Sequence, residues 1–262
     1  MLAEVMAAVR DVAHAEIVPR YLRAAATRKY DGSLVSEADP AAQRALTARL
    51  RAILDVPVLG EEMPAAEQRA VWDRASTELW CVDPIDGTTN FVSGIPYFGV
   101  SVALMREGRP RLGVVFNPAT DELFAAERGQ GATLNGVALP LRRAKVPLTR
   151  AVASVEFKRL GRSLTRALIE ERPYYSQRNY GAAALDWCYV AAGRFDLYLH
   201  ASHLLWDCAA GSVILDEAGG RAGTFAAEAF WDDPEWARPV IAALDPELYV
   251  EWREWLRARV GE

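Results

Sequence analysis

Residues 78–99 of this 262-residue chain read ELWCVDPIDGTTNFVSGIPYFG, in which an apolar run ends abruptly at two aspartates. The apolar residues 79–82 followed by DPIDG at 83–87 predict a buried strand that ends in a tight turn. Proline fixes φ and glycine tolerates positive φ, so Pro84 and Gly87 suit that turn. Ligands of α/β proteins bind outside the carboxyl ends of strands, so the two carboxylates lie where a ligand is expected.

Asp83 and Asp86 would repel one another in such a turn. Two like charges about 4 Å apart repel by about 1 kcal/mol in water and about 4 kcal/mol at an effective dielectric constant of about 20. A divalent cation would offset this repulsion, and a hard cation such as Mg²⁺ prefers carboxylate oxygens. Thr88 and Thr89 follow at an expected helix start, where backbone N–H groups can receive an anion. The alternative is an ordinary surface turn, because Asp, Pro and Gly are the commonest turn residues.

Four more acidic residues lie at expected ends of strands and helices. Glu61 and Glu62 directly follow the apolar segment 56–60, which predicts a short strand. Because a second acidic strand end follows within one connection, a shared carboxylate cluster is the better interpretation for them than solvated surface charge. Asp39 lies near the start of an expected helix and Asp207 in the first turn of another, where helix capping or the helix dipole explains each.

Four motifs, in this combination and order, resemble those of the inositol monophosphatase family, which are Mg²⁺-dependent, Li⁺-sensitive phosphomonoesterases. The motifs are DPIDGTTNF at 83–91, GEE at 60–62, WDCAAG at 206–211 and LVSEAD at 34–39. The resemblance spans roughly residues 2–220 and implies an α+β fold, a layered α/β/α/β/α sandwich of the sugar-phosphatase type. It implies an antiparallel meander sheet in a metal-binding half at 1–145 and a smaller α/β half at 146–262 that completes the substrate pocket.

The resemblance also implies the residues of a two-metal phosphatase site. Two Mg²⁺ ions about 3.5–4 Å apart, the spacing of two-metal phosphoryl-transfer sites, would share five ligands: Glu61, Asp83, the backbone carbonyl of Ile85, Asp86 and Asp207. Thr88 and Asp39 would orient and deprotonate the attacking water, with Glu62 assisting as a base or ligand orienter. Donors at the turn would hold the phosphate, and the substrate-binding residues would be Gly87, Thr88, Ala183, His200 and Asp207.

The second half departs from the family pattern at two positions. Ala182 replaces a hydroxyl residue common in the pocket. His200 stands seven residues before Asp207, where a glutamate usually accepts hydrogen bonds from the hydroxyls of inositol. A neutral imidazole accepts one hydrogen bond and a carboxylate several, so discrimination among polyols should weaken or change.

Other histidine and basic residues of the second half have a structural and a functional interpretation. His200 and His203 form His-x-x-His, but without a third ligand nearby this pattern argues against zinc. Lys158, Arg159 and Arg178 are either surface charges or contacts to a second anionic group of the substrate.

The composition argues against several classes of protein. An apolar fraction of 51% with 25% charged residues is ordinary for a soluble globular protein. A net charge of −5 and a pI near 5.4 argue against a nucleic-acid binder with a basic surface. Charged residues interrupt the apolar residues of 1–16, which excludes a signal peptide, and no apolar run approaches the length of a membrane span. Three scattered cysteines without a Cys-x-x-Cys pair favour a reducing cytoplasm.

Hydrophobic periodicity predicts the order of elements. In the first half we expect helices at 2–17 and 40–54, strands at 56–60, 79–82, 99–105, 111–116 and 122–126, and turns at 129–136. In the second half, after a boundary at 141–150, we expect strands at 151–155, 195–199 and 240–244 and helices at 160–171, 181–192, 204–218 and 246–260. Residues 28–33 are expected to form a loop and 63–74 a polar connection, mobile in character, whose closure over the site the sequence leaves open.

These observations favour a cytoplasmic Mg²⁺-dependent, Li⁺-sensitive phosphomonoesterase that acts on inositol 1-phosphate or a related small sugar or polyol phosphate. A homodimer is expected, and membrane and nucleic-acid partners are not. Within the superfamily, His200 leaves 3′,5′-bisphosphate nucleotidase, histidinol-phosphatase and fructose-bisphosphatase activities open. A regulatory binding role in transcription, known for some bacterial relatives, is the alternative from another class, although the intact carboxylate set argues against lost catalysis.

Overall fold

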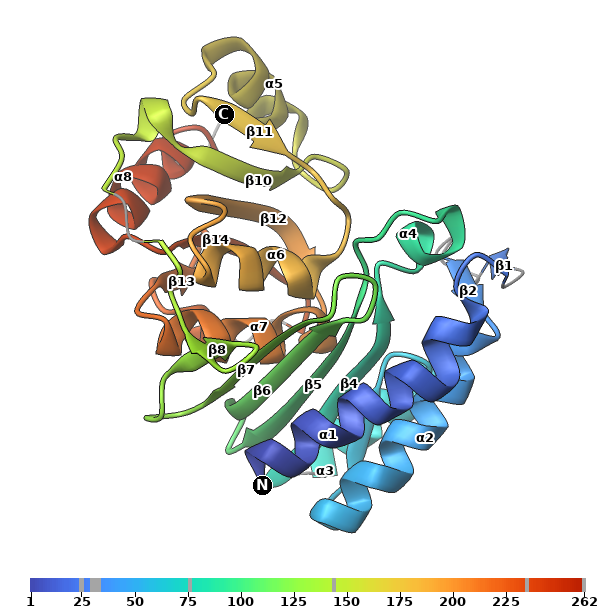
Figure 1. The fold of residues 1–262 in the computed structure, drawn as a ribbon. Helices are drawn as coiled ribbons and strands as arrows, with labels where there is room; N and C mark the ends of the chain where they lie inside the picture. Colours follow the sequence, from blue (N-terminus) through green and yellow to red (C-terminus); the bar gives the residue numbers. More distant parts are fainter. Residues whose placement is uncertain (24–25, 29–33, 75–76, 143–144, 234–235, 261–262) are drawn as a thin grey trace.

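A seven-stranded sheet forms from the first half of the chain (Figure 1). The computed structural model describes residues 1–23, 26–28, 34–74, 77–142, 145–233 and 236–260. The strands, in their order across the sheet, are β3 (Val58–Gly60), β4 (Glu78–Asp86), β5 (Gly99–Arg106), β6 (Arg109–Asn117), β7 (Glu122–Glu127), β8 (Ala132–Leu134) and β9 (Val137–Ala138). β3 is parallel to β4, and every later pair is antiparallel. The predicted antiparallel meander is confirmed.

Both faces of the central strands of this sheet are buried, because these strands place apolar side chains on alternate sides. The helices that cover the two faces are α1 (Leu2–Val12) and α2 (Ala38–Ile53) on one, and α6 (Ala183–Ala191) and α7 (Leu205–Glu217) on the other. Trp80 and Val82 of β4 pack with α1 and α2. Leu79 and Cys81 of the same strand pack with α6 and α7. The continuous apolar run in β4 therefore reflects a strand covered on both sides.

A second sheet of five strands lies beyond α6 and α7 (Figure 1). Its strands, in order, are β11 (Ser176–Arg178), β10 (Val152–Glu156), β12 (Leu197–His203), β14 (Arg238–Ala243) and β13 (Arg221–Gly223). Tyr198 of β12 packs toward α6 and α7. The next residue, Leu199, packs with α5 (Arg162–Glu171) and α8 (Pro246–Arg257) on the outer face. The order of layers is thus α/β/α/β/α, as predicted.

Several expectations for single elements are wrong. The expected polar connection at 63–74 contains a helix, α3 (Ala65–Arg74), in which Trp72 packs edge-on against Trp236 with ring centroids 5.7 Å apart. The expected turns at 129–136 include β8, which pairs with β9. The short strand β11 was not expected, and β12 extends to His203.

The expected loop at 28–33 falls mainly outside the described residues. Arg28 ends the short strand β1 (Ala26–Arg28), which pairs with β2 (Leu34–Ser36), and residues 29–33 are not described. The division of the chain at residue 145 stays a prediction. In the described ranges, no helix combines the length and the apolar character needed to cross a membrane.

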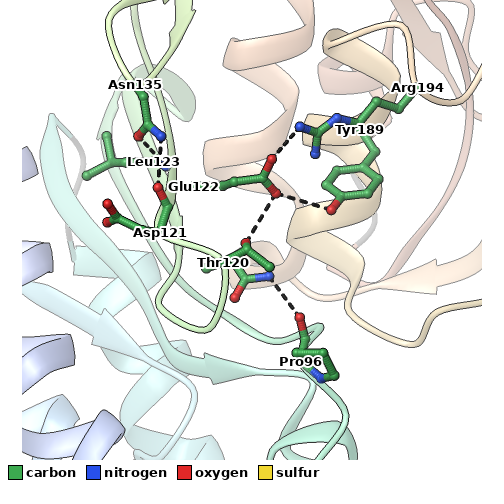
Figure 2. A network of polar contacts seen from close by, with 9 residues as sticks. Pro96, Thr120, Asp121, Glu122, Leu123, Asn135, Tyr189 and Arg194 are labelled. Atoms are coloured by element: carbon green, nitrogen blue, oxygen red, sulfur yellow. Dashed lines mark hydrogen bonds and ion pairs between the residues drawn. The ribbon is translucent and has the colours of Figure 1, made fainter.

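A polar network fixes the carboxyl end of α6 to the first sheet (Figure 2). Glu122 of β7 accepts hydrogen bonds from the hydroxyls of Tyr189 and Thr120, each at 3.2 Å, and from the guanidinium of Arg194. Burial alone would raise the pKa of Glu122, but its bond and ion pair with Arg194 lower the pKa below its ordinary value. The network therefore holds a helix of the middle layer to a strand of the first sheet. Glu122 precedes Tyr189 by 67 residues and Arg194 by 72 residues.

Candidate active site

The end of β4 brings Asp83 and Asp86 together through a bulge in the strand. The expected strand end at 82 is wrong, because β4 continues to Asp86 with a shift in its pairing to β5 between the two aspartates. Bulges bend a strand and re-aim its side chains. Asp83 Oδ1 accepts a hydrogen bond from the N–H of Ile85 at 3.0 Å, so the turn fixes this carboxylate locally.

The Asp86 carboxylate receives the amino end of α6. Its Oδ1 accepts from the N–H of Ala183 at 3.1 Å and its Oδ2 from the N–H of Ala184 at 2.7 Å. These two N–H groups are among those that lack partners within the helix, so Asp86 caps α6 from another element. Burial raises the pKa of Asp86 to about 7, although the bonds from Ala184 and Ala183 oppose that shift.

Asp207 joins these aspartates from the first turn of α7. Its Oδ2 accepts from the N–H of Leu204 at 2.9 Å, which confirms its predicted position at a helix start. One carboxylate oxygen from each of Asp83, Asp86 and Asp207 lies within 4.8 Å of the others. Three elements that are distant in sequence therefore supply one acidic cluster.

Glu61, which directly follows β3, adds a fourth carboxylate beside Asp83. Burial raises the pKa of Asp83 well above its ordinary value, and the carboxylate of Glu61 is the next largest cause. Burial likewise raises the pKa of Asp207, and the charge of Asp86 adds to the rise. Carboxylates crowded in this way are stabilised by binding protons or a cation. A set made only of carboxylate and carbonyl oxygens fits a hard divalent cation such as Mg²⁺.

Asp39 and Thr88 meet next to the acidic cluster. Asp39, buried in the first turn of α2, accepts at Oδ2 from the N–H and the hydroxyl of Ser36, at 2.8 and 2.6 Å. The Thr88 hydroxyl lies 3.3 Å from Asp39 Oδ1 and 3.0 Å from the carbonyl of Ile85. Since a hydroxyl donates one proton, Thr88 bonds one of these acceptors at a time. Asp39 thus serves the start of α2 and reaches the β4 turn through Thr88, although it is fully buried.

Gly87 begins the short helix α4 (Thr88–Ser93) with φ +85°. A Cβ atom at this position would lie 3.0 Å from Ala182 Cβ and 3.2 Å from the carbonyl oxygen of Tyr97. Both the backbone conformation and the close approach of the 181–184 segment therefore require glycine here.

A pocket of about 240 Å³ opens over the cluster and reaches the second sheet. Its polar lining residues are Glu61, Asp86, Glu156, Lys158, Arg159, Asp186, His200, Ser202 and Asp207. Ala182 and Ala183 also line it, but the Ala183 N–H is bound to Asp86. Among the described lining residues Glu62 does not occur; its N–H lies 3.5 Å from Gln43 Oε1.

Sequence reasoning did not foresee Asp186 and Glu156 at this pocket. Asp186 follows Ala183 by three residues on α6, so the helical period places both on one face. Burial raises the pKa of Asp186 to about 7, and the bond that its Oδ1 accepts from the Tyr97 hydroxyl at 2.8 Å opposes the rise. Glu156 pairs directly with His200 across β10 and β12, a register that only the sheet reveals.

A model described as the inositol monophosphatase family matches residues 1–258. The chain belongs to the inositol monophosphatase family. This family member is 45% identical over 192 residues to an inositol-1-monophosphatase of Rhizobium meliloti (strain 1021), over 71% of this chain and 70% of the relative. It is 37% identical over 206 residues to the Nus factor SuhB of Pasteurella multocida (strain Pm70), over 76% of this chain and 74% of the relative.

Solved structures of the inositol monophosphatase family share the whole fold. The Thermotoga maritima IMPase superposes with a TM-score of 0.81 at 30% identity, over 98% of this chain and 97% of the other. The extragenic suppressor protein suhB from Bartonella henselae superposes with a TM-score of 0.84 at 28% identity, over 99% and 98%. Family membership makes the chain a phosphomonoesterase.

Proposed function

We propose that this chain catalyses the Mg²⁺-dependent, Li⁺-sensitive hydrolysis of inositol 1-phosphate or a related small sugar or polyol phosphate. The observation that carries the proposal is the convergence of Asp83, Asp86 and Asp207 within 4.8 Å beside a pocket of about 240 Å³. Such a pocket holds a small phosphate ester, with the phosphate toward the acidic cluster.

Mg²⁺ would be held by Glu61, Asp83, the carbonyl of Ile85, Asp86 and Asp207. When bound, Mg²⁺ would lower the pKa of the water that it coordinates and would neutralise charge on the ester oxygens. The chain contributes the fixed positions of these ligands. Asp86 is oriented by two N–H groups of α6, Asp207 by the N–H of Leu204 and Asp83 by that of Ile85.

Thr88 and Asp39 are proposed to orient and deprotonate the attacking water. Their contact supports this role, because a hydroxyl that donates to Asp39 Oδ1 leaves its own oxygen to accept a bond from water. Gly87 and Thr88 begin α4, whose first N–H groups lack partners within the helix and can bind a phosphate oxygen. Glu62 is proposed to assist from outside the pocket lining, and Ala183 and His200 to contact the rest of the substrate.

Phosphate release from a panel of monoesters, with and without Mg²⁺ and with added Li⁺, tests the proposal. The panel includes inositol 1-phosphate, a 3′,5′-bisphosphate nucleotide, histidinol phosphate and fructose 1,6-bisphosphate. Mg²⁺-dependent, Li⁺-inhibited release from inositol 1-phosphate supports it. Activity confined to a nucleotide or to histidinol phosphate would overturn the substrate, and no release from any ester would overturn the activity.

A regulatory binding role in transcription is the second candidate, favoured by the similarity to the Nus factor SuhB of Pasteurella multocida. Retention of RNA polymerase by the immobilised full chain, at physiological salt, tests it. The catalytically impaired Asp83→Asn variant should retain the polymerase equally well if binding and hydrolysis are separate properties.

We further propose that the chain forms a homodimer in the cytoplasm. Each subunit is proposed to consist of two halves, residues 1–145 and residues 146–262. The three free, buried cysteines support a reducing compartment. Light scattering coupled to size exclusion measures the oligomeric state, and expression of residues 1–145 alone tests whether that half folds by itself.

A further inference from the structure

The carboxyl ends of β10 and β12 form one wall of the pocket, which we define as the second-sheet wall: Glu156, Lys158, Arg159, His200 and Ser202. β10 and β12 are parallel neighbours, and Glu156 pairs with His200 at the last position of their pairing, where β10 ends and β12 continues to His203. Ligands collect outside the carboxyl ends of parallel strands, so this wall is positioned to contact the part of a substrate remote from the phosphate.

His200 presents a hydrogen-bond donor to this pocket. Burial and the charge of Arg159 lower the pKa of His200 to about 4, so the ring is neutral near pH 7. Its Nδ1 accepts the N–H of Ser202 at 3.2 Å, which places the ring proton on Nε2. Nε2 has no hydrogen-bond partner among the described residues. Nδ1, the one acceptor nitrogen of the neutral His200 ring, is therefore already bound to Ser202. A ligand in the pocket would contact the Nε2–H donor instead.

His203 packs against the His200 ring. The two ring centroids lie 4.2 Å apart, and His203 is fully buried. The indole N–H of Trp187 donates to His203 Nδ1 at 3.3 Å, and the Tyr198 hydroxyl lies 2.9 Å from Nε2. Both ring nitrogens of His203 thus have partners, so His203 packs against the His200 ring and fixes its position. Of the two histidines, His200 is the one that can contact a ligand.

Lys158 and Arg159 add two cations to the wall. Within the described part of the chain, neither the Lys158 amine nor the Arg159 guanidinium has a hydrogen bond or ion pair. Both cations line the same pocket as Asp207 of the acidic cluster. Glu156 supplies the opposing charge on the wall, and its Oε1 accepts the Lys158 N–H at 2.7 Å. Asp186 lines the pocket too, bound by the Tyr97 hydroxyl.

We propose that the second-sheet wall binds a second anionic group of the substrate, a carboxylate or a second phosphate, through Arg159, Lys158 and the Nε2–H of His200. The preferred substrate is then a phosphate monoester that carries another anion. A polyol phosphate without a second anionic group is bound less well. This inference rests on the proposed hydrolysis, because it concerns the same pocket.

Matched pairs of esters test the inference and separate the two anions. Fructose 1-phosphate against fructose 1,6-bisphosphate examines a second phosphate, and glycerol 1-phosphate against 3-phosphoglycerate examines a carboxylate. We expect kcat/KM to be about tenfold higher for the doubly anionic member of at least one pair, mainly through a lower KM, as expected for charge-assisted hydrogen bonds.

Three variants locate the effect. Arg159→Gln, an exposed position, should reduce that preference to about onefold, mainly by raising KM for the doubly anionic ester. His200→Glu should reduce the preference as well, because a carboxylate at this position repels a second anion. His200→Gln keeps a donor and should retain most of the preference. Arg178→Gln is the matched control, because Arg178 lies on β11 bound to Ser176 and the Gln177 carbonyl and does not line this pocket.

The outcomes distinguish this inference from the proposed function. If no ester is hydrolysed with Mg²⁺, the proposed function fails. If inositol 1-phosphate is hydrolysed but neither second anion lowers KM, or if Arg159→Gln lowers kcat/KM equally for both members of each pair, the second-sheet wall does not bind an anion and the inference fails alone.

Discussion

At the scale of single residues, the candidate site is built from side chains and backbone positions that serve the fold as well. Gly87 allows the 181–184 segment to approach at the start of α4, Asp39 bonds Ser36 at the start of α2, and Asp86 caps α6. Substitutions there should therefore affect both stability and activity, and suitable controls can separate the two effects.

Gly87→Ala should cost about 2–3 kcal/mol of unfolding free energy, because it combines left-handed backbone strain with a close contact to Ala182. Gly136→Ala is the matched control, since Gly136 has φ +81° but no atom within 4 Å of a Cβ there. We expect the control to lose about 1 kcal/mol in urea unfolding and to retain phosphatase activity. Equal losses in the two variants would show that the contact with Ala182 is unimportant.

Asp186 should make stability depend on pH. Its pKa in the folded protein is about 7 against an ordinary 3.8, so the folded state binds the proton more tightly between these values. The free energy of unfolding therefore falls as pH rises from 4 to 7, by about 1.4 kcal/mol for each unit.

Asp186→Asn should remove this contribution. Urea unfolding at pH 5 and pH 7, in Mg²⁺ buffer, should show the variant gaining about 2 kcal/mol relative to the unchanged protein at the higher pH. A difference that does not vary with pH would mean that Asp186 stays ionised in the folded state.

At the scale of elements, α6 is fixed at both ends by the first sheet. Asp86 of β4 receives its amino end, and Glu122 of β7 holds its carboxyl end through Tyr189 and Arg194 (Figure 2). Because Ala183 and Asp186 on this helix line the pocket, the Glu122 network helps to set the position of the pocket lining.

Glu122→Gln should cost about 1 kcal/mol at pH 7, since the ion pair with Arg194 is partly buried. The pKa of Glu122 is lowered in the folded protein, so its contribution is present above pH 4.5 and is lost as pH falls below that value. Glu170→Gln breaks an exposed pair with Arg166 and should leave the melting temperature nearly unchanged. Thermal unfolding at pH 7 and pH 3.5 compares the two variants.

At the scale of the whole molecule, the pocket depends on both sheets and on the helical layer between them. Asp83 comes from the first sheet, Asp207 from the middle layer and His200 from the second sheet. A cation bound to the acidic cluster would therefore add a further link between the first sheet and the helical layer, which apolar packing and the bonds of Asp86 and Glu122 already join.

Mg²⁺ should raise the thermal stability of the full chain, by about 2.7 kcal/mol at a concentration 100 times its dissociation constant. Asp83→Asn should remove most of this gain, and hydrolysis with it, yet leave stability in EDTA unchanged or higher, because one repulsive charge is gone. Asp216→Asn, on the far part of α7 beside Arg128, is the control that keeps the Mg²⁺ response. Scanning fluorimetry with EDTA or Mg²⁺ measures each case.

Strong periodicity and short motifs predicted the strands of the meander and the acidic residues, because both are encoded locally, whereas the order of the layers came from the resemblance to the family. Sequence reasoning missed α3 and β11, whose polar composition is compensated by distant partners: Trp236 for Trp72 of α3, and β10 for β11. It also could not reveal that Asp86 caps α6, 97 residues away, or that Ser202 occupies Nδ1 of His200. These features depend on tertiary register, which a single sequence does not display.

Asp86 both caps α6 and belongs to the acidic cluster, which affects how relatives that have lost hydrolytic activity should be identified. A lineage in which hydrolysis no longer matters would still be selected to keep an acid at this position, because α6 would otherwise lose its cap. Asp83 bonds locally to Ile85, shares a hydrogen bond with Glu61 and is crowded by like charges, so selection for the reaction is the main influence that maintains it. Replacement of Asp83, with Asp86 intact, is therefore the clearer indication that a relative has lost catalytic activity.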